Sequence, residues 1–353
     1  MELTSTQYVT ITGSSFLVTG GAGFIGSHIA EFLLNAGAQK VRVLDNLSTG
    51  NFRNVAPFAN HRNFEFVKGD IGNLDTCKAA CKGINYVFHQ AALGSVPRSL
   101  IDPVTTTWVN TNGFVNMIVA ARDANVNRFI YASSSSVYGD NNELPKTETM
   151  TGNPLSPYAV TKCSNELYAG IFSRTYGMET IGLRYFNVFG QRQDPNSAYA
   201  AVIPKFILQL IRHESPVING TGEFTRDFTY IDNVVQANML AALTTNPQAV
   251  NQVYNIAFGK QTSLNQLASD LKELLAELDE NIATIGFTHA PGRPGDIPHS
   301  YASIRKAKEL LGYTPLYSVR EGLKKSVDWY WVNLQRFELC AEERALSALT
   351  YSV

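Results

Sequence analysis

Residues 19–26, Thr-Gly-Gly-Ala-Gly-Phe-Ile-Gly, decide the fold of this chain. They follow the apolar run Phe16–Thr19, a predicted buried strand, and lead into a predicted helix, Phe24–Ala36, that Gly37 stops. Three glycines let the backbone turn tightly, approach a pyrophosphate and pack the helix on the strand: Gly20, Gly23 and Gly26. The N-terminus of the helix then faces the anion. The stretch therefore predicts a dinucleotide-binding loop.

Short β-rich runs alternate with helical stretches from about Ser15 to Arg184. The predicted strands of this region are Phe16–Thr19, Val41–Asp45, Phe64–Val67, Tyr86–His89, Arg128–Ala132 and Thr180–Arg184. Nearly continuous apolar strands separated by helices are typical of a parallel sheet that helices cover on both faces. We therefore expect an α/β fold with a Rossmann-like, doubly wound parallel sheet.

The second half of the chain has more Pro, Gly and Asn in its loops, and its predicted strands are sporadic. The clearest are Val217–Asn219, Asp227–Tyr230 and Val253–Ile256. Ser263–Gln266 is predicted to be a capping box that opens a helix. A leucine stripe predicts that one side of this helix faces the core: Leu267, Leu271, Leu274 and Leu278.

The expected domain organisation has three parts. Residues 1–14 form an N-terminal extension. Residues 15–189 form the dinucleotide-binding domain, to which a segment at about 233–258 returns. Residues 190–353 are mainly a smaller α/β substrate-binding lobe, with a helical tail from about Asn333.

The composition is that of an ordinary globular protein, with 44% apolar and 17% charged residues. A net charge of -1 gives no electrostatic reason to expect nucleic acid or an acidic membrane as a partner. No apolar run approaches the roughly 18 residues that span a bilayer, and Met1–Gly13 does not resemble a secretory signal. Four cysteines without clustered metal ligands predict reduced thiols, a cytoplasmic location and no metal site: Cys77, Cys81, Cys163 and Cys340.

Acidic residues after the second and third strands indicate which dinucleotide binds. Asp45 lies about 20 residues after Gly26, where a carboxylate accepts hydrogen bonds from the adenosine ribose and repels a 2′-phosphate. This favours NAD over NADP, although Asp45 could instead cap the turn into Asn46. Asp70 either faces the adenine or is a loop residue. The backbone of His89–Ala92 is expected to pass close to the cofactor, with His89 itself structural.

The stretch Ser156-Pro157-Tyr158-Ala-Val-Thr-Lys162 predicts a helix start that places a phenol and an ammonium one turn apart. The ammonium of Lys162 is expected to lower the pKa of Tyr158, otherwise about 10, because it favours the phenolate. Upstream, Ser133–Ser136 follow a strand at the sheet edge where doubly wound folds bind ligands. A hydroxyl-rich turn is the plain alternative for these serines. With the glycine loop, the three features predict a proton-transfer site beside a dinucleotide.

With these motifs the chain resembles the extended short-chain dehydrogenase/reductases, and among them the nucleotide-sugar 4-epimerases, over roughly residues 14–332. Three segments resemble the UDP-N-acetylglucosamine 4-epimerases of bacterial surface-polysaccharide synthesis: His89–Ser99, Asn187–Pro195 and Ala198–Lys205. The resemblance implies NAD as cofactor, a UDP-sugar as substrate, and as catalytic residues Ser134 or Ser135, Tyr158 and Lys162.

The resemblance also implies two sets of binding residues. For the cofactor, besides the three glycines, the two aspartates, Tyr158 and Lys162, they are Phe24, Ile25, Asn46, Ser48, Thr49, Gly50, Ile71, Gln90, Ala91, Ala92, Asn110 and Tyr185. For the UDP-sugar they are Gly94, Ser95, Val96, Ser134, Ser135, Ser136, Asn187, Tyr199, Ala200, Ala201, Val202, Lys205, Asn219, Arg226, Arg293, Asp296 and Ser300.

In the implied reaction, Tyr158 removes the proton of the sugar 4-hydroxyl while the 4-hydrogen leaves as hydride to the nicotinamide. Ser134 or Ser135 holds the oxygen, and Lys162 keeps Tyr158 acidic and binds the nicotinamide ribose. The resulting 4-keto sugar then takes hydride on its other face. Because there is no net redox change, NAD is expected to stay bound.

Related dehydratases place Asp-Glu after the catalytic hydroxyl residue, and related decarboxylases carry a Glu in the same turn. Here the corresponding positions are Ser135 and Ser136, and a serine cannot replace a carboxylic acid at neutral pH. The resemblance therefore favours epimerisation. A keto-reductase and a non-catalytic NAD(H)-sensing protein stay as rival interpretations, the second opposed by the intact Ser134, Tyr158 and Lys162.

Substrate choice is expected to depend on Ser300, where epimerases limited to unacetylated hexoses have a bulky tyrosine. A small residue leaves room for a 2-acetamido group. UDP-glucose and UDP-galactose, and uronic acids held by Arg98 or the serines, stay as alternatives. For the diphosphate, Arg226 and Arg293 fit the family positions. However, Arg226 could pair with Asp227 or Asp232, and Arg293 could be a solvated loop charge.

A homodimer is expected by family analogy. Two helices, one at about Val104–Asp123 and one that starts at Pro157, would pair with their mates in a four-helix bundle. The sequence itself shows only that these helices carry apolar faces, which packing within one chain would explain equally well.

Overall fold

A computed structural model describes residues 3–196, 200–292 and 298–350, with side chains up to residue 334. The chain divides into two compact units. The first consists of Met1–Val188, Asp227–Lys260 and Ser300–Tyr317, and the second of Phe189–Arg226, Gln261–His299 and Ser318–Val353. The expected returning segment, at about 233–258, lies within the first return. The second return has no counterpart in the sequence-based division.

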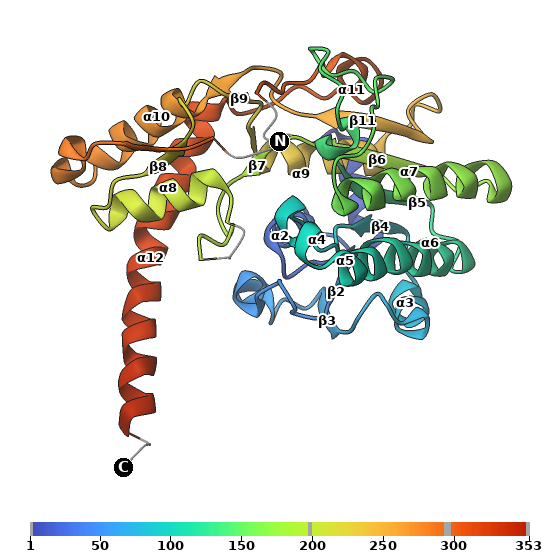
Figure 1. Ribbon diagram of the computed structural model, residues 1–353. Helices are drawn as coiled ribbons and strands as arrows, with labels where there is room; N and C mark the ends of the chain where they lie inside the picture. The colour runs from blue at the N-terminus through green and yellow to red at the C-terminus, as the bar shows by residue number, and fades with distance from the viewer. Residues whose placement is uncertain (1–2, 197–199, 293–297, 351–353) are drawn as a thin grey trace. The chain divides into compact units, whose positions relative to one another are not determined.

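The centre of the first unit is a seven-stranded parallel sheet (Figure 1). From one edge to the other its strands are β3 (Phe64–Lys68), β2 (Lys40–Asp45), β1 (Ser15–Thr19), β4 (Tyr86–His89), β5 (Arg128–Ser134), β6 (Thr180–Tyr185) and β11 (Gln252–Ile256). The order reverses between β1 and β4, the point at which doubly wound sheets bind ligands. All five residues of β1 are buried, as a strand covered on both faces requires.

Two groups of helices flank this sheet, and the helices within each group contact one another. One group is α2 (Phe24–Asn35), α9 (Ile231–Leu243) and α11 (Arg305–Leu311), and the other is α3 (Leu74–Cys81), α6 (Gly113–Asp123) and α7 (Pro157–Tyr176). Shorter helices of the same unit are α1 (Ser5–Thr12), α4 (Val96–Ile101) and α5 (Pro103–Thr107). The expected Rossmann-like doubly wound fold is therefore confirmed.

The second unit is built around three helices that contact one another: α8 (Val202–Ile211), α10 (Leu264–Ala276) and α12 (Val319–Thr350). Short strands complete it as the pairs β8 (Val217–Asn219) with β13 (Thr288–Ala290) and β9 (Thr225–Arg226) with β12 (Thr262–Ser263). Leu267, Leu271 and Leu274 are buried as predicted. Leu278 is 42% exposed because α10 ends at Ala276, so its assignment to the core stripe is wrong.

All six strands predicted in the first half are present. The predicted strand Val253–Ile256 is present as part of β11 in the central sheet. Two other predictions need correction. Only Thr229–Tyr230 of Asp227–Tyr230 forms a strand, β10, which pairs with β7 (Val188–Phe189). Ser263 accepts a hydrogen bond from the Gln266 amide, but the Gln266 side chain donates to Asp270, so the capping box is only half formed.

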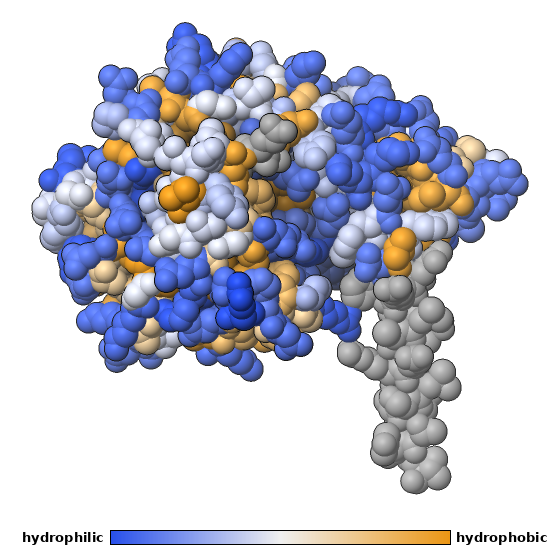
Figure 2. All heavy atoms as spheres, turned by 180° about the vertical axis from the view of Figure 1, so that it is seen from behind, coloured by the Kyte–Doolittle hydropathy of each residue, from blue (hydrophilic) through white to orange (hydrophobic). Residues whose placement is uncertain are grey.

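The helix predicted at about Val104–Asp123 is interrupted. Between α5 and α6, residues Trp108–Asn112 form a π-helical turn, which rotates the side chains on either side of it relative to a continuous α-helix. On the face drawn in Figure 2, hydrophobic residues are scattered among hydrophilic ones. Within the described parts of the chain, no helix has the length and apolarity needed to cross a membrane.

Candidate functional site

A cavity of about 420 Å³ lies at the carboxyl ends of the central strands, entirely within the first unit. Gly20 follows β1, Asp45 ends β2, Gln90 follows β4 and Ser134 ends β5. Because these strands lie on both sides of the point where the strand order reverses, the cavity occupies the position at which this fold class binds its ligand.

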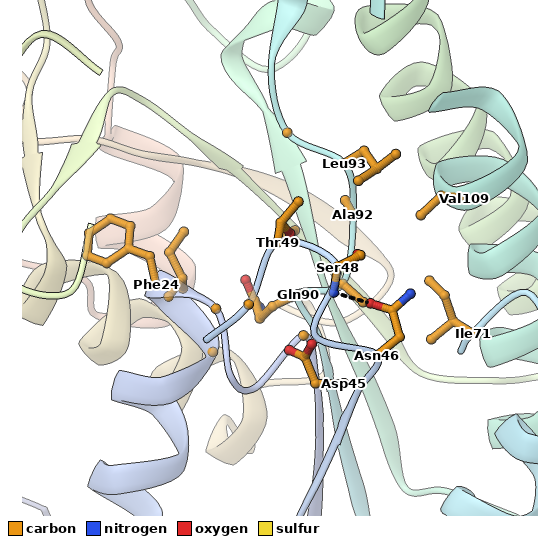
Figure 3. Close-up of a pocket in the computed structure, with 18 of the residues that line it drawn as sticks. Phe24, Asp45, Asn46, Ser48, Thr49, Ile71, Gln90, Ala92, Leu93 and Val109 are labelled. Carbon is orange, nitrogen blue, oxygen red and sulfur yellow. Dashed lines mark hydrogen bonds between the residues drawn. The ribbon is translucent and has the colours of Figure 1, made fainter. Parts of the chain in front are cut away.

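The cavity brings together nearly all of the residues predicted for the cofactor (Figure 3). Its lining includes Gly20, Gly23, Phe24, Ile25, Gly26, Asp45, Asn46, Ser48, Thr49, Gly50, Asp70, Ile71, Gln90, Ala91, Ala92, Tyr158, Lys162 and Tyr185. Asn110 does not line it. The Asn110 amide instead exchanges hydrogen bonds with the backbone of Leu93, which does line the cavity, and donates to Thr161.

The glycine loop is packed so closely that side chains cannot enter it. Gly20 has φ +65°, and a Cβ there would lie 2.8 Å from the Ala91 Cα atom. A Cβ at Gly26 would lie 2.3 Å from the Gly20 carbonyl oxygen. Helix α2 begins after Gly23, which provides no side-chain cap, so the first backbone N–H groups have no cap from that position. This arrangement fits a pyrophosphate at the helix N-terminus.

Asp45 is a buried carboxylate at the end of β2. Its Oδ2 accepts a hydrogen bond from the Ala22 amide at 2.9 Å, and its Oδ1 accepts one from the Leu47 amide at 2.8 Å. The turn cap considered from the sequence is therefore present, and the carboxylate also lines the cavity. Each carboxylate oxygen has a second lone pair, so Asp45 can still accept from a ribose hydroxyl.

His89 is a structural residue, as predicted. Its Nδ1 is 2.9 Å from the Thr19 hydroxyl oxygen, and its ring packs against Phe114 and Phe129. Burial, reinforced by the charge of Lys162, lowers the pKa of His89 to about 3. The imidazole is therefore neutral across the physiological pH range.

Tyr158 and Lys162 lie at the start of α7, with Ser134 facing them from the end of β5. The Ser156 hydroxyl caps this helix by accepting from the Ala159 amide at 3.2 Å, and Pro157 occupies the first turn. The Lys162 Nζ atom donates to the Ala132 carbonyl at 2.8 Å and lies 5.8 Å from the centroid of the Tyr158 ring. Ser134 lies close enough to the Tyr158 hydroxyl to affect its pKa.

Burial is the main influence on the pKa values of Tyr158 and Lys162. It raises the pKa of Tyr158, and the neighbouring Ser134 only opposes the shift. The expectation that Lys162 lowers the pKa of Tyr158 below its ordinary value is thus wrong in this structure, since the desolvation of the phenolate outweighs its neighbours. Burial also lowers the pKa of Lys162 to about 8, against the opposing charge of Glu166.

Comparison with known proteins agrees with this site. Residues 16–257 match the NAD dependent epimerase/dehydratase family. The chain belongs to this family. The family is NAD-dependent, so the cofactor expected from the glycine loop and Asp45 is confirmed.

Individual relatives within the family differ in the sugar they are named for. A putative UDP-glucose 4-epimerase of Methanocaldococcus jannaschii is 39% identical over 315 residues, which cover 89% of this chain and 97% of the relative. The structure of a UDP-N-acetylglucosamine 4-epimerase from Methanobrevibacter ruminantium M1, in complex with UDP-N-acetylmuramic acid, is similar with a TM-score of 0.84. It is 40% identical, and the match covers 91% of this chain and 99% of that one.

A third relative was solved with the cofactor. It is a UDP-glucuronic acid 4-epimerase from Bacillus cereus, in complex with UDP-glucuronic acid and NAD. Its TM-score is 0.79 at 31% identity, with 89% of this chain and 98% of that one covered. All three relatives match over nearly their whole length, and their names give three different sugars.

The structure distinguishes the serines that the sequence left open. Ser133 and Ser134 line the cavity, whereas Ser135 and Ser136 are absent from its lining. The Ser136 amide and hydroxyl both donate to the Ser134 Oγ atom, at 3.1 and 3.0 Å. Of the two serines considered for catalysis, Ser134 is therefore the one that lines the cavity.

Several lining residues were not predicted: Leu44, Gly69, Leu93, Val109, Ala132, Ser133 and Val188. Most are chain neighbours of predicted residues and could have been included by extending each motif by one position. Val109 is different, because it belongs to the π-helical turn Trp108–Asn112 in a segment that the sequence predicts as a regular helix.

The residues predicted for the UDP-sugar are divided between the two units. Gly94, Ser134 and Asn187 line the cavity, whereas Ser95 caps α4 by accepting from the Arg98 amide, and Val96 is the first residue of that helix. Ser300 lies in the second return to the first unit and is partly exposed. The second unit carries Ala200, Ala201, Val202, Lys205, Asn219 and Arg226. Tyr199, Arg293 and Asp296 lie outside the described residues.

The Arg226 guanidinium lies on β9 of the second unit, where its Nη1 donates to the carbonyls of Thr225 and Pro298 at 2.9 and 3.3 Å. Its neighbour Asp227 accepts from the backbone amides of Phe258, Gly259 and Ala302 in the first unit. Among the described residues there is no cluster of three or more His, Cys, Asp or Glu side chains that would hold a metal ion.

Proposed function

We propose that this protein interconverts UDP-N-acetylglucosamine and UDP-N-acetylgalactosamine by inverting C4 through a 4-keto sugar. The observation that carries the proposal is that Ser134, Tyr158 and Lys162 line the same cavity as the glycine loop, with the Lys162 ammonium 5.8 Å from the centroid of the phenol ring. It places an acid/base group, its hydroxyl partner and a cation next to the dinucleotide loop.

The residues present fit NAD. The close packing of Gly20, Gly23 and Gly26 at the N-terminus of α2 leaves backbone N–H groups for the pyrophosphate, and Asp45 offers a carboxylate to the ribose. When bound, NAD supplies a reversible acceptor for hydride. Because epimerisation gives back to the sugar the hydride that it removes, the cofactor is not consumed and is expected to stay bound to the enzyme.

The chain's own residues handle the proton. In its phenolate form, Tyr158 takes the proton from the sugar 4-hydroxyl as the C4 hydrogen leaves, and returns it when the keto sugar is reduced on its other face. Because burial of the free site raises the pKa of Tyr158, the reaction depends on neighbouring groups that favour the phenolate. Ser134 has a single O–H, which favours the Tyr158 phenolate in the free site and donates to the sugar oxygen when substrate is bound. Lys162 carries a positive charge 5.8 Å from the centroid of the Tyr158 ring, and in the proposed reaction this charge favours the phenolate.

The acids that line the cavity are placed for binding and not for removing water from the sugar. Asp45 accepts from the Ala22 and Leu47 amides, and Asp70 accepts from the Asn46 side chain and the Gly72 amide. Next to Ser134 the chain has Ser135 and Ser136, where a dehydratase needs carboxylates. This supports reversible oxidation at C4 without loss of water.

We further propose that the second unit, through Arg226, Lys205, Asn219 and the Ala200–Val202 backbone, holds the UDP part of the substrate. A guanidinium suits a diphosphate because it is always charged and can bind two oxygens at once. The rest of the proposal concerns the sugar, which Ser300 is expected to select.

A second candidate substrate pair is UDP-glucose and UDP-galactose, because a relative that is 39% identical is named for UDP-glucose. The small side chain at Ser300 favours the acetamido sugars. The test measures C4 epimerisation by the wild-type chain and by Ser300→Tyr, each with UDP-N-acetylglucosamine, UDP-glucose and UDP-glucuronic acid. We expect the wild type to prefer the acetamido sugar and Ser300→Tyr to lose that activity selectively.

The matched control is Ser300→Ala, which keeps the position small and should retain the wild-type preference. Equal losses on acetamido and plain sugars in Ser300→Tyr would refute the role of Ser300. A wild-type chain that epimerises only UDP-glucose would replace the acetamido assignment with the second candidate.

A further inference from the structure

A buried ion pair lies directly behind the cavity and takes no part in the chemistry described above. The Arg184 side chain donates to Glu166 through Nε at 2.8 Å and through Nη2 at 2.7 Å. The Arg184 side chain is 3% exposed and the Glu166 side chain 13%. Such a pair costs desolvation energy that its attraction need not recover, so its presence in the core calls for a role other than stability.

From Glu166 the contacts lead to the reacting residues. Glu166 lies one turn after Lys162 on α7 and accepts a hydrogen bond from the Ser133 hydroxyl at 2.5 Å. Ser133 lies on β5 between Ala132, whose carbonyl receives the Lys162 ammonium, and Ser134. Glu166 therefore ties the end of the strand that carries the serine to the helix that carries Tyr158 and Lys162.

From Arg184 the contacts lead away from the cavity, toward the segment that carries Ser300. Arg184 donates through Nη1 to the Tyr138 hydroxyl at 3.1 Å, and Tyr138 donates to the Asn255 Oδ1 atom at 2.5 Å. Asn255 in turn donates to the Ser303 carbonyl at 3.2 Å. All of these groups belong to the first unit, so one buried series of hydrogen bonds joins Ser133 to the Ser300–Ser303 segment.

We infer that Glu166 and Arg184 are positioning residues for the proposed reaction: they hold Ser134 and Lys162 in register with Tyr158 and keep Lys162 cationic. The inference rests on the proposed function for its catalytic consequence. Neither side chain lines the cavity, so neither is assigned contact with cofactor or substrate.

The electrostatic part of the role follows from the charges around Lys162. Burial lowers the pKa of Lys162 to about 8, and the Glu166 carboxylate opposes that shift. Removing the carboxylate should lower the pKa of Lys162 further, so the ammonium loses its proton at a lower pH. The titratable groups that interact with Lys162, Glu166 or Arg184 are His89 on β4, Tyr131 on β5, Tyr138 after β5, Tyr158 and Cys163 on α7, and Lys306 on α11. Glu148 contacts Arg184 through its backbone carbonyl, and its carboxylate faces Tyr138 and Lys306.

The experiment compares the wild-type chain with Glu166→Gln by two measurements. The first is kcat and KM for UDP-sugar epimerisation as a function of pH. We expect kcat to fall roughly tenfold at neutral pH, the alkaline decline to move about one unit lower, and KM to change less than about twofold, because positioning acts on the chemical step. A uniform loss at every pH would indicate a merely structural role and would overturn the inference.

The second measurement needs no substrate. The purified protein is treated with acetic anhydride at a series of pH values, and acetylation of Lys162 is followed by peptide mass spectrometry. The midpoint should lie about one unit lower in Glu166→Gln than in the wild type. An unchanged midpoint overturns the inference even if activity falls, whereas a wild-type chain that epimerises no UDP-sugar overturns the proposed function instead.

Two further variants keep the test interpretable. Because Glu166→Gln leaves a buried arginine without its partner, the double variant Glu166→Gln/Arg184→Met removes both charges and should show the same displaced Lys162 midpoint. Glu179→Gln is the matched control, since it breaks the Arg128–Glu179 pair, which joins the opposite end of β5 to the start of β6. It should leave both the pH profile and the Lys162 midpoint at their wild-type values, and a displacement equal to that of Glu166→Gln would contradict the assignment.

Discussion

At the scale of single residues, the sequence predicts candidate reacting groups but not their protonation. The spacing of Tyr158 and Lys162 is a local property of a helix, so it can be predicted from seven residues. The pKa values depend on how much water the fold removes, which is set by strands far away in the sequence. Burial therefore reverses the expected direction for Tyr158, and only the structure separates Ser134 from Ser135.

Replacing Tyr158 by phenylalanine should remove the group that exchanges the proton while keeping the shape of the site. We expect Tyr158→Phe to lower kcat for epimerisation by roughly a hundredfold to ten-thousandfold, with bound NAD unchanged. Both are measured on purified protein by a product assay and by release of NAD on denaturation. Tyr168→Phe, on an exposed position of the same helix, is the control. Undiminished turnover in Tyr158→Phe would refute the mechanism.

The protonation of Lys162 gives the reaction a predicted alkaline limit. With a pKa of about 8, Lys162 carries its charge below that pH and loses it above, so the stabilisation of the Tyr158 anion fades as pH rises. We expect kcat to decline with a midpoint near pH 8. The check is kcat at saturating substrate from neutral to alkaline pH. A rate that stays constant or rises through this range would contradict the role of the ammonium.

At the scale of elements, the glycine loop is predicted well because its requirements are steric and local. The π-helical turn Trp108–Asn112 is missed because no residue pattern within it signals the extra residue per turn. Its consequence is functional, since the turn places Val109 in the cavity wall and lets Asn110 hold Leu93. A contact that depends on such a local irregularity is invisible to helical periodicity.

A single methyl group in the glycine loop should eliminate cofactor binding. The Cβ atom of Gly26→Ala would lie 2.3 Å from the Gly20 carbonyl oxygen and 2.8 Å from the Gly21 Cα atom, and both are backbone atoms that a side-chain rotation cannot move. We expect the purified variant to contain little or no NAD, as measured by absorbance after denaturation. Gly286→Ala, where the added carbon meets open space, should retain the full amount. A variant at Gly26 with full NAD would show that the loop adapts.

At the scale of the whole molecule, the order of helices and strands along the chain is easier to predict than which of the two units each one belongs to. The alternation of strands and helices in the first half leads to the parallel sheet, because neighbouring βαβ units have a fixed hand. Which later segment pairs with the sheet edge is a non-local matter. The run Val253–Ile256 lies in the segment expected to return to the first unit, where it pairs with β6, whereas the return of Ser300 to that unit is not expected from the sequence.

We propose that the chain forms a homodimer through α4, α5 and α7. These helices contact one another (Figure 1). They carry large exposed apolar side chains, including Leu100, Val104, Leu167 and Ile171. A second copy would bury this face by the pairing of like helices. Sedimentation equilibrium should show a dimer for the wild type and a monomer for Leu167→Glu. Val9→Glu, which changes an equally exposed position on α1, should remain a dimer. A monomeric wild type would refute the proposal.

The central claim is that hydride leaves C4 and returns to it within one bound cofactor, and isotope labelling tests this most directly. UDP-N-acetylglucosamine carrying deuterium at C4 is incubated with the purified protein in ordinary water without added NAD or NADH. We predict UDP-N-acetylgalactosamine that retains deuterium at C4. Loss of the deuterium to solvent, or a product that forms only with stoichiometric NADH, would contradict the account.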